Sequence, residues 1–263
     1  MEQEHKVEQR NQWRQYAIIG VLVAVGLGGA LYLLSLGGDD GDDGATTTSS
    51  TFASTTSVAE VLVPAVSAPA AGGTIDGTAD CPADDGSSER ITSFAEAPPT
   101  CIDATSTYVA EIETTLGQIV VELDPAKAPE TVNNFVFLAR YHYYDGAPFH
   151  RIVPGFVIQG GDATGDPLGT GNPGYMIGEE PPEPDEYEIG SLAMAKGAGD
   201  NSTGSQFFIV TGPQGVSLPN QYSLFGSVTE GLEVVSAIEG LPTTPDNYPT
   251  EEIYINSVSI TES

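Results

Sequence analysis

Short runs of apolar residues, separated by glycine, proline and polar turns, fill the chain from about residue 106 to its end. Residues 108–114 and 118–123 are rich in β-branched side chains, and Leu116-Gly117 lies between them, which predicts a β-hairpin. Residues 253–260 predict a final strand. Many short strands combined with two helical patterns favour a mainly β domain, a closed β-barrel with helices over its ends.

Two segments carry the spacing of an amphipathic helix. The first begins near Pro129, which suits a first turn because the missing N–H would have no partner there, and it extends to about Arg140. The second covers residues 232–239 and is followed by Gly240 and Pro242, which terminate helices. In the first helix, the apolar positions that share one face are Val132, Phe135, Val136 and Ala139.

An uncharged apolar stretch lies near the N-terminus, at residues 17–36. Twenty helical residues span about 30 Å, the thickness of a bilayer core. We therefore predict a transmembrane signal-anchor helix. A cleaved signal peptide is the alternative, but its apolar region would be shorter, and Ser35-Leu36-Gly37 is a poor cleavage site. The aromatic residues near the ends of the stretch are Trp13, Tyr16 and Tyr32.

The flanking charges predict the orientation of this anchor. All basic residues of the first 36 lie in residues 1–16, so the positive-inside rule makes these residues a cytoplasmic tail. We therefore expect a single-pass cell-membrane protein whose chain after Leu36 is extracytoplasmic. Residues 37–78 are mostly Gly, Asp, Thr, Ser and Ala, which predicts a disordered linker. A cysteine-bracketed extension, residues 79–105, then precedes a folded domain at residues 106–263.

The charge of the chain is strongly asymmetric. Three of the 37 acidic and three of the eight basic residues precede Gly37, which leaves 34 acidic and five basic residues beyond the predicted anchor. Binding of nucleic acid requires clustered Lys or Arg, so we expect no nucleic-acid partner. The acidic surface is interpreted as a means of solubility, and the domain is expected to be monomeric.

Two cysteines, Cys81 and Cys101, both follow the predicted anchor. Outside the cytoplasm such a pair is more typical of a disulfide than of a metal site, and no nearby histidine completes a zinc ligand set. We therefore predict that a disulfide attaches the extension to the domain. No metal and no cofactor are expected.

Residues 149–162 set one arginine and one glutamine into an apolar run with strand character. Arg151 and Gln159 have the same strand parity, and Pro154-Gly155 between them predicts a break or bulge that bends the strand. An arginine among apolar side chains is unusual because a buried charge requires a partner. The alternative is a core strand that exposes Arg151 at one end.

Two other chemical patterns do not predict function. Residues 169–174 satisfy the dinucleotide fingerprint G-x-G-x-x-G, but Pro173 and the acidic, proline-rich residues 179–182 exclude the helix that would hold a pyrophosphate. We interpret this segment as a glycine-rich surface loop. His142 and His150 have no metal-ligand spacing and are interpreted as packed or hydrogen-bonded residues.

Three motifs occur in order: YDGAPFHR at residues 144–151, GFVIQGGD at 155–162, and GSQFFIV at 204–210, which follows SLAMAK at 191–196 and a glycine-rich loop. Together they resemble the cyclophilin family of peptidyl-prolyl cis-trans isomerases, from about Tyr108 to Ile260. The cysteine-bracketed segment is similar to one in membrane-anchored bacterial members.

The resemblance implies a closed eight-stranded antiparallel β-barrel capped by two α-helices, with a shallow groove on its outer face. It also implies that Arg151 is the catalytic cation and that Gln159 orients it. The residues implied to receive the substrate proline ring are Phe156, Val157, Phe208 and Leu218. Those implied to meet the rest of the peptide are Ala195, Lys196 and Gln206, and Tyr222 falls where many members have His.

The chain also departs from the family pattern at Ser217 and Lys196. Ser217 occupies the place of a tryptophan whose absence is associated with weak cyclosporin binding. Lys196 replaces a common asparagine, a change of little consequence if the contact is made by the backbone.

Isomerisation of an X–Pro bond breaks no covalent bond, so it needs no nucleophile, metal or general base. It needs a grip on the proline ring and a donor that stabilises the twisted amide, and arginine supplies that donor because it stays protonated. We expect an isomerase that assists folding of exported proteins, with proline-containing polypeptides as partners. The alternative is a non-catalytic proline-peptide binding or chaperone module on the same fold.

Overall fold

The computed structural model describes residues 70–263. The predicted tail, the anchor at residues 17–36 and most of the predicted linker lie outside the described residues, so these remain predictions. Within residues 70–263, none of the helices combines the length and the hydropathy that crossing a membrane requires.

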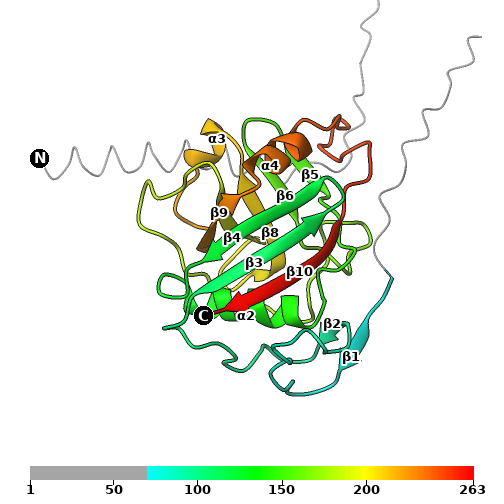
Figure 1. The fold of residues 1–263 in the computed structure, drawn as a ribbon. Helices are drawn as coiled ribbons and strands as arrows, with labels where there is room; N and C mark the ends of the chain where they lie inside the picture. The colour runs from blue at the N-terminus through cyan, green and yellow to red at the C-terminus, as the bar shows by residue number, and fades with distance from the viewer. Residues whose placement is uncertain (1–69) are drawn as a thin grey trace, which may run out of the picture. The chain divides into compact units, whose positions relative to one another are not determined.

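Eight antiparallel strands form one curled sheet in the order β10-β3-β4-β9-β7-β8-β6-β5 (Figure 1). Their bounds are β3 (Tyr108–Thr114), β4 (Gly117–Leu123), β5 (Arg151–Val153), β6 (Val157–Gly160), β7 (Ser191–Lys196), β8 (Thr203–Val210), β9 (Leu224–Glu230) and β10 (Ile255–Glu262). The predicted hairpin is confirmed, because Thr114 pairs with Gly117 where β3 turns into β4.

The sheet is open, so the prediction of a closed barrel is wrong. Its edge strands, β5 and β10, have no continuous ladder between them. The segments that precede them meet only through the isolated bridge between Pro148 and Tyr254 and a few backbone hydrogen bonds beside it, such as Phe149 N–H to Ile253 O at 3.0 Å. Little of this edge is available for pairing, because β5 is only three residues long.

Within residues 70–263, three helices accompany the sheet: α2 (Pro129–Arg140), α3 (Pro213–Val216) and α4 (Leu232–Glu239). In Figure 1, α2 and α4 lie at opposite ends of the curled sheet. Both predicted helices are confirmed, and Pro129 lies in the first turn of α2 as expected. The sequence predicted one buried face for α2, but every residue from Thr131 to Arg140 is buried.

The residues before β3 explain this complete burial. The strand β1 (Gly73–Ile75) pairs in parallel with β2 (Ile91–Phe94), and the chain that follows packs along α2. Residues 73–75 were predicted to belong to the disordered linker, and for these residues the prediction is wrong. They are ordered because they pair with β2 and because Ile75 packs against the main core.

The main core fills the inside of the curled sheet. Phe135 of α2 packs there against the rings of Tyr144, Phe207 and Phe225, at centroid separations of 5.1, 5.7 and 5.3 Å. Strand residues of one parity complete it, because alternate side chains of a strand point to the same face. They include Ile112, Ile119, Val121, Ile158, Leu192, Met194 and Ile209, all fully buried.

Candidate active site

The hairpin of β5 and β6 brings Arg151 and Gln159 together. The two residues are directly paired across the strands, and an Arg151 Nη1–H donates to Gln159 Oε1 at 3.3 Å. Pro154-Gly155 therefore forms part of a hairpin turn rather than a bulge within one strand. Gly155 has φ of 75°, a left-handed conformation that a glycine adopts without strain. The shared parity predicted for Arg151 and Gln159 is confirmed.

An apolar cluster lies beside this pair, on the outer face of the sheet. Val157 and Phe208 are buried in it, with Tyr187, Ala193 and Val210. The partly buried side chains that pack against the cluster are Phe156, Ala195, Leu218, Tyr222 and Leu224. The cluster thus gathers all four residues that were implied to receive a proline ring.

The guanidinium of Arg151 faces this cluster. Its Cζ lies 5.8 Å from the ring centroid of Phe156, within the range of a cation–π interaction. Burial lowers the pKa of Arg151, and the neighbouring Tyr222 opposes this change. Burial also raises the pKa of Tyr222, which therefore stays a neutral phenol at pH 7. Arg151 is consequently a partly desolvated cation beside an apolar surface.

Two side-chain amides, those of Gln159 and Gln206, extend the hydrogen-bond network that begins at Arg151. Gln159 Nε2–H donates to Gln206 Oε1 at 3.1 Å. The Nε2 of Gln206 donates in turn to the carbonyl oxygens of Gly169 and Gly171, at 3.1 and 3.0 Å. Residues 169–174, which were interpreted from the sequence as a glycine-rich surface loop, therefore contact the site directly. We call this segment the glycine-rich loop from here on.

A small hollow of about 200 Å³ adjoins Gln206. Its wall includes Ala195, Lys196 and Met176. The Nζ of Lys196 lies 3.5 Å from Glu179 Oε1, so the lysine is ion-paired at its margin. The residues implied to meet the peptide chain thus adjoin the Arg151 pair through Gln206.

The loop that contains Ser217 and Tyr222 is held by hydrogen bonds from side-chain hydroxyls to backbone oxygens. Ser217 follows α3 and donates its hydroxyl to Pro213 O at 2.9 Å. Tyr222 is fixed by Tyr187, whose hydroxyl donates to Tyr222 O at 2.7 Å, and the Tyr222 ring meets Phe208 edge-on at 5.4 Å. Tyr187 was not predicted as a site residue, and its surroundings of acidic and proline residues gave no signal for it.

Asp162 is a second residue that sequence reasoning missed. It is fully buried, and its carboxylate accepts backbone N–H groups from Gly165, Gly169 and Gly171 at 2.6–2.9 Å, and from Thr164 at 3.0 Å. These bonds hold the glycine-rich loop against the sheet. The signal for this role was the aspartate that ends GFVIQGGD directly before a glycine-rich segment.

His150 is packed beneath the same loop, as interpreted from the sequence. It is 3% exposed, and burial lowers its pKa to about 4, with Asp162 opposing and Arg151 reinforcing the shift. At neutral pH it is therefore an uncharged ring behind the site.

The geometry defines a class: an antiparallel β fold that presents an arginine–glutamine pair beside an outer apolar cluster. The family model described as cyclophilin type peptidyl-prolyl cis-trans isomerase/CLD matches residues 109–260. The chain therefore belongs to the cyclophilin-type peptidyl-prolyl cis-trans isomerase family, and the prediction of an isomerase enzyme is confirmed.

Individual relatives agree with this assignment. Peptidyl-prolyl cis-trans isomerase-like 1 of Gibberella zeae is 39% identical over 158 residues, which are 57% of this chain and 93% of that protein. Peptidyl-prolyl cis-trans isomerase B of Bacillus subtilis is 50% identical over 117 residues, 44% of this chain and 79% of that protein. Some other relatives are longer, and the chain spans about a quarter of their length.

Solved structures also match. The crystal structure of a cyclophilin type peptidyl-prolyl cis-trans isomerase of Cryptosporidium parvum, in the presence of the dipeptide Ala-Pro, has a TM-score of 0.53 and 33% identity. The match covers 59% of this chain and 99% of that one. In this protein the predicted pairing of Cys81 with Cys101 is confirmed, but both cysteines belong to the extension, so the disulfide closes the extension on itself and does not attach it to the domain.

Proposed function

We propose that Arg151 accelerates X–Pro isomerisation by stabilising the twisted amide, in which the nitrogen has regained its lone pair. Rotation about a peptide bond faces a barrier of roughly 18–20 kcal/mol because that lone pair is otherwise delocalised into the carbonyl. Uncatalysed X–Pro exchange takes about 10–100 s. A rate gain of about 10⁵ corresponds to lowering the barrier by ~7 kcal/mol.

The position of Arg151 supports this role. Its guanidinium stays protonated, and it lies beside Phe156, where the apolar surroundings strengthen an electrostatic interaction. Its hydrogen bond to Gln159 holds one N–H donor of the guanidinium in place. Because the group is planar, this bond also fixes the direction of its other N–H donors. A donor held in place before the amide twists costs no reorganisation when it does, and this lowers the barrier.

The apolar cluster is the proposed grip on the proline ring. Phe156, Val157, Phe208 and Leu218 share one patch, and Phe156 and Leu218 are only partly buried. The presence of Ala-Pro in the Cryptosporidium parvum crystal supports a proline-containing peptide as the substrate class. The peptide backbone would then extend past Ala195, Lys196 and Gln206 toward the adjoining hollow.

We also propose a cellular location for the enzyme. We infer a membrane-anchored isomerase, held by residues 17–36 with its N-terminus in the cytoplasm, that assists folding of exported proteins. The uncharged stretch and the basic residues before it support the orientation. The disulfide between Cys81 and Cys101 supports an oxidising compartment for the domain. Protease added to intact cells should remove the domain, and protection from the protease would contradict this topology.

Catalysis by Arg151 is tested by a prolyl test-peptide assay on the full chain in detergent. We expect Arg151→Ala to lower kcat/KM by about 10²-fold, the effect of removing one preorganised donor, while the melting temperature changes little. Lys127→Ala is the matched control, because it also removes one positive charge but from an exposed ion pair with Glu186. It should leave kcat/KM unchanged.

Equal activity of wild type and Arg151→Ala would exclude this mechanism. A wild-type chain that binds prolyl peptides without accelerating their isomerisation would instead favour the alternative of a binding or chaperone module.

A further inference from the structure

The cysteine-bracketed extension contacts the glycine-rich loop that holds Gln206. The backbone N–H of Phe94, the last residue of β2, donates to Pro173 O at 2.8 Å. The Phe94 side chain is 1% exposed, and its ring lies 5.0 Å from Phe137 and 6.2 Å from Tyr175. A methyl group added to Gly174 would come within 2.3 Å of Phe94 O. The extension therefore packs against the end of the loop with no space between them.

The carbonyl groups of Gly169 and Gly171, in the same loop, determine the orientation of the Gln206 side-chain amide. The Nε2 of Gln206 donates to two loop carbonyls, those of Gly169 and Gly171, and only the NH₂ end of an amide can do so. Its Oε1 must then face Gln159, whose own Oε1 is left to accept from Arg151. A displaced loop would release both carbonyl contacts and allow the amide to turn. The order of donors and acceptors up to Arg151 therefore depends on where the loop lies.

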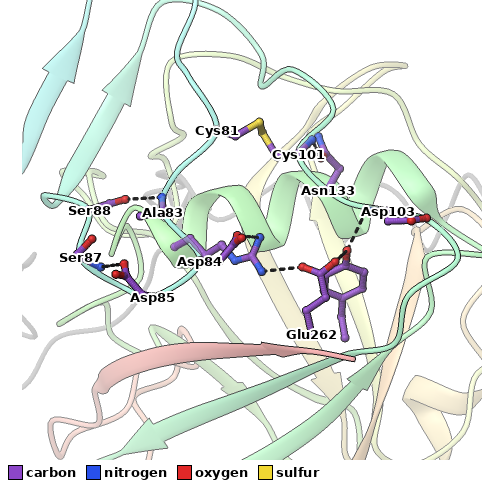
Figure 2. A network of polar contacts seen from close by, with 12 residues as sticks. Cys81, Ala83, Asp84, Asp85, Ser87, Ser88, Cys101, Asp103, Asn133 and Glu262 are labelled. Atoms are coloured by element: carbon purple, nitrogen blue, oxygen red, sulfur yellow. Dashed lines mark hydrogen bonds and ion pairs between the residues drawn. A yellow bond between two sulfur atoms is a disulfide. The ribbon is translucent and has the colours of Figure 1, made fainter.

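The extension is itself firmly attached to α2, as Figure 2 shows. The disulfide joins its two ends, and the Asn133 side chain of α2 accepts from Cys101 N–H and donates to Pro99 O at 2.7 and 2.9 Å. Arg140, 6% exposed, bridges Asp84 of the extension and Glu262 of β10 at 2.7 and 3.0 Å. Because these contacts span its length, the extension is a rigid support for the loop. It also precedes residues 109–260, which match the family.

We propose that the extension, residues 79–105, is a positioning element of the proline site, and that Phe94 acts through the glycine-rich loop on the orientation of Gln206. Asp162 holds the loop from within the domain, and Phe94 holds it from outside. This inference rests on the proposed function, since the orientation of Gln206 affects catalysis through Gln159 and Arg151.

Gly174→Ala in the full chain tests the contact between extension and loop directly. Gly77→Ala is the matched control: both glycines have left-handed φ, 102° and 132°, but a methyl on Gly77 meets nothing within 4 Å. We expect Gly174→Ala to lower kcat roughly fivefold to tenfold with little change in KM, because small misplacement of a catalytic group is costly. Gly77→Ala should retain the wild-type kcat. Equal kcat for the two variants would overturn the inference.

A double-mutant cycle separates positioning from a general loss of stability. If Phe94 acts through Gln206, Phe94→Ala should lower kcat in the wild-type background but not further in a Gln206→Ala background. Phe94→Leu, which keeps an apolar side chain in the same place, should restore most of the activity. A loss of kcat of the same size in both backgrounds would show that Phe94 acts on the fold alone and would overturn the inference.

The side-chain amide signal of Gln206 in ¹⁵N-labelled protein gives a readout that does not depend on turnover. Gly174→Ala should shift this signal, and Gly77→Ala should not; an unshifted signal in both would count against the inference. An inactive wild type in which Gly174→Ala still shifts the Gln206 signal would overturn the proposed catalytic function and leave the structural coupling standing. The two failures are thereby distinguished.

Discussion

The two faces of strands β6 and β8 carry similar side chains in different surroundings. Ile158, Phe207 and Ile209 point into the main core, and Val157, Phe208 and Val210 point to the outer cluster. All six are nearly or fully buried. Amino-acid type therefore does not distinguish the face that stabilises the fold from the face that carries the chemistry.

The difference lies in what covers each face. The core is closed by the rings of α2 and by the other strands, whereas the outer cluster is covered by half-buried residues such as Phe156, Leu218 and Tyr222. Arg151 and Gln159 lie at the margin of that incomplete cover. An apolar surface that is partly open beside an oriented cation can bind a proline ring, and a closed core cannot.

Phe207 and Phe208 test the difference between the two faces most directly, because they are neighbours in sequence whose side chains lie on opposite faces of β8. We expect Phe207→Ala to lower the free energy of unfolding by about 3–5 kcal/mol, the usual result of emptying a core site. Phe208→Ala should cost roughly half as much stability, since its half-buried neighbours can relax, but it should lower kcat/KM at least tenfold by weakening the grip on the ring. Urea unfolding and the prolyl-peptide assay measure the two effects.

If the two substitutions lower activity and stability in the same proportion, the division between the faces does not hold. The assay is run well below the melting temperature of Phe207→Ala, so that the variant is folded.

His150 sharpens the comparison through pH. Its pKa is about 4 in the folded protein against about 6.5 in the unfolded chain, so only the unfolded chain binds a proton between these values. The contribution of neutral, buried His150 to the free energy of unfolding is therefore fully present above pH 6.5. As the pH falls toward 4, the free energy of unfolding decreases by about 2–3 kcal/mol. In contrast, kcat should stay flat from pH 8 to 5, because Arg151 does not titrate there. Unfolding measured at pH 7 and 5, with His150→Gln as control, tests this; a slope that persists in the variant must come from another group.

Lys196 should have the smallest effect. Its ammonium is ion-paired with Glu179 at the edge of the hollow, so we expect its contact with the peptide to be made by the backbone. We expect Lys196→Asn to change kcat/KM less than twofold. A larger loss would show that the lysine side chain, rather than its backbone, meets the peptide.

The fold was predictable where local rules apply. Pro129, Gly240 and Pro242 marked the helices, and strand parity placed Arg151 beside Gln159. Closure of the barrel was predicted wrongly, because it depends on how two distant edges meet at Pro148 and Tyr254. The helix α3 is too short for periodicity to reveal.

The site was predictable only in part. The arginine and the apolar residues were found through motifs, but the contacts of Gln206 with Gly169 and Gly171 join segments more than 30 residues apart. No local pattern indicates which way an amide turns. Phe94 was missed for the same reason, since its partners on the loop and on α2 are distant in sequence.

The separation of binding from catalysis in Arg151→Ala tests the proposed role of this cation most directly. Exchange spectroscopy on a labelled Ala-Pro peptide with the full chain gives both the dissociation constant and the rate of interconversion on the enzyme. We expect the variant to bind the peptide within about threefold of wild type, because the apolar cluster is intact, and to interconvert it about 10²-fold more slowly. A variant that loses binding but interconverts bound peptide at the wild-type rate would show that Arg151 only holds the substrate.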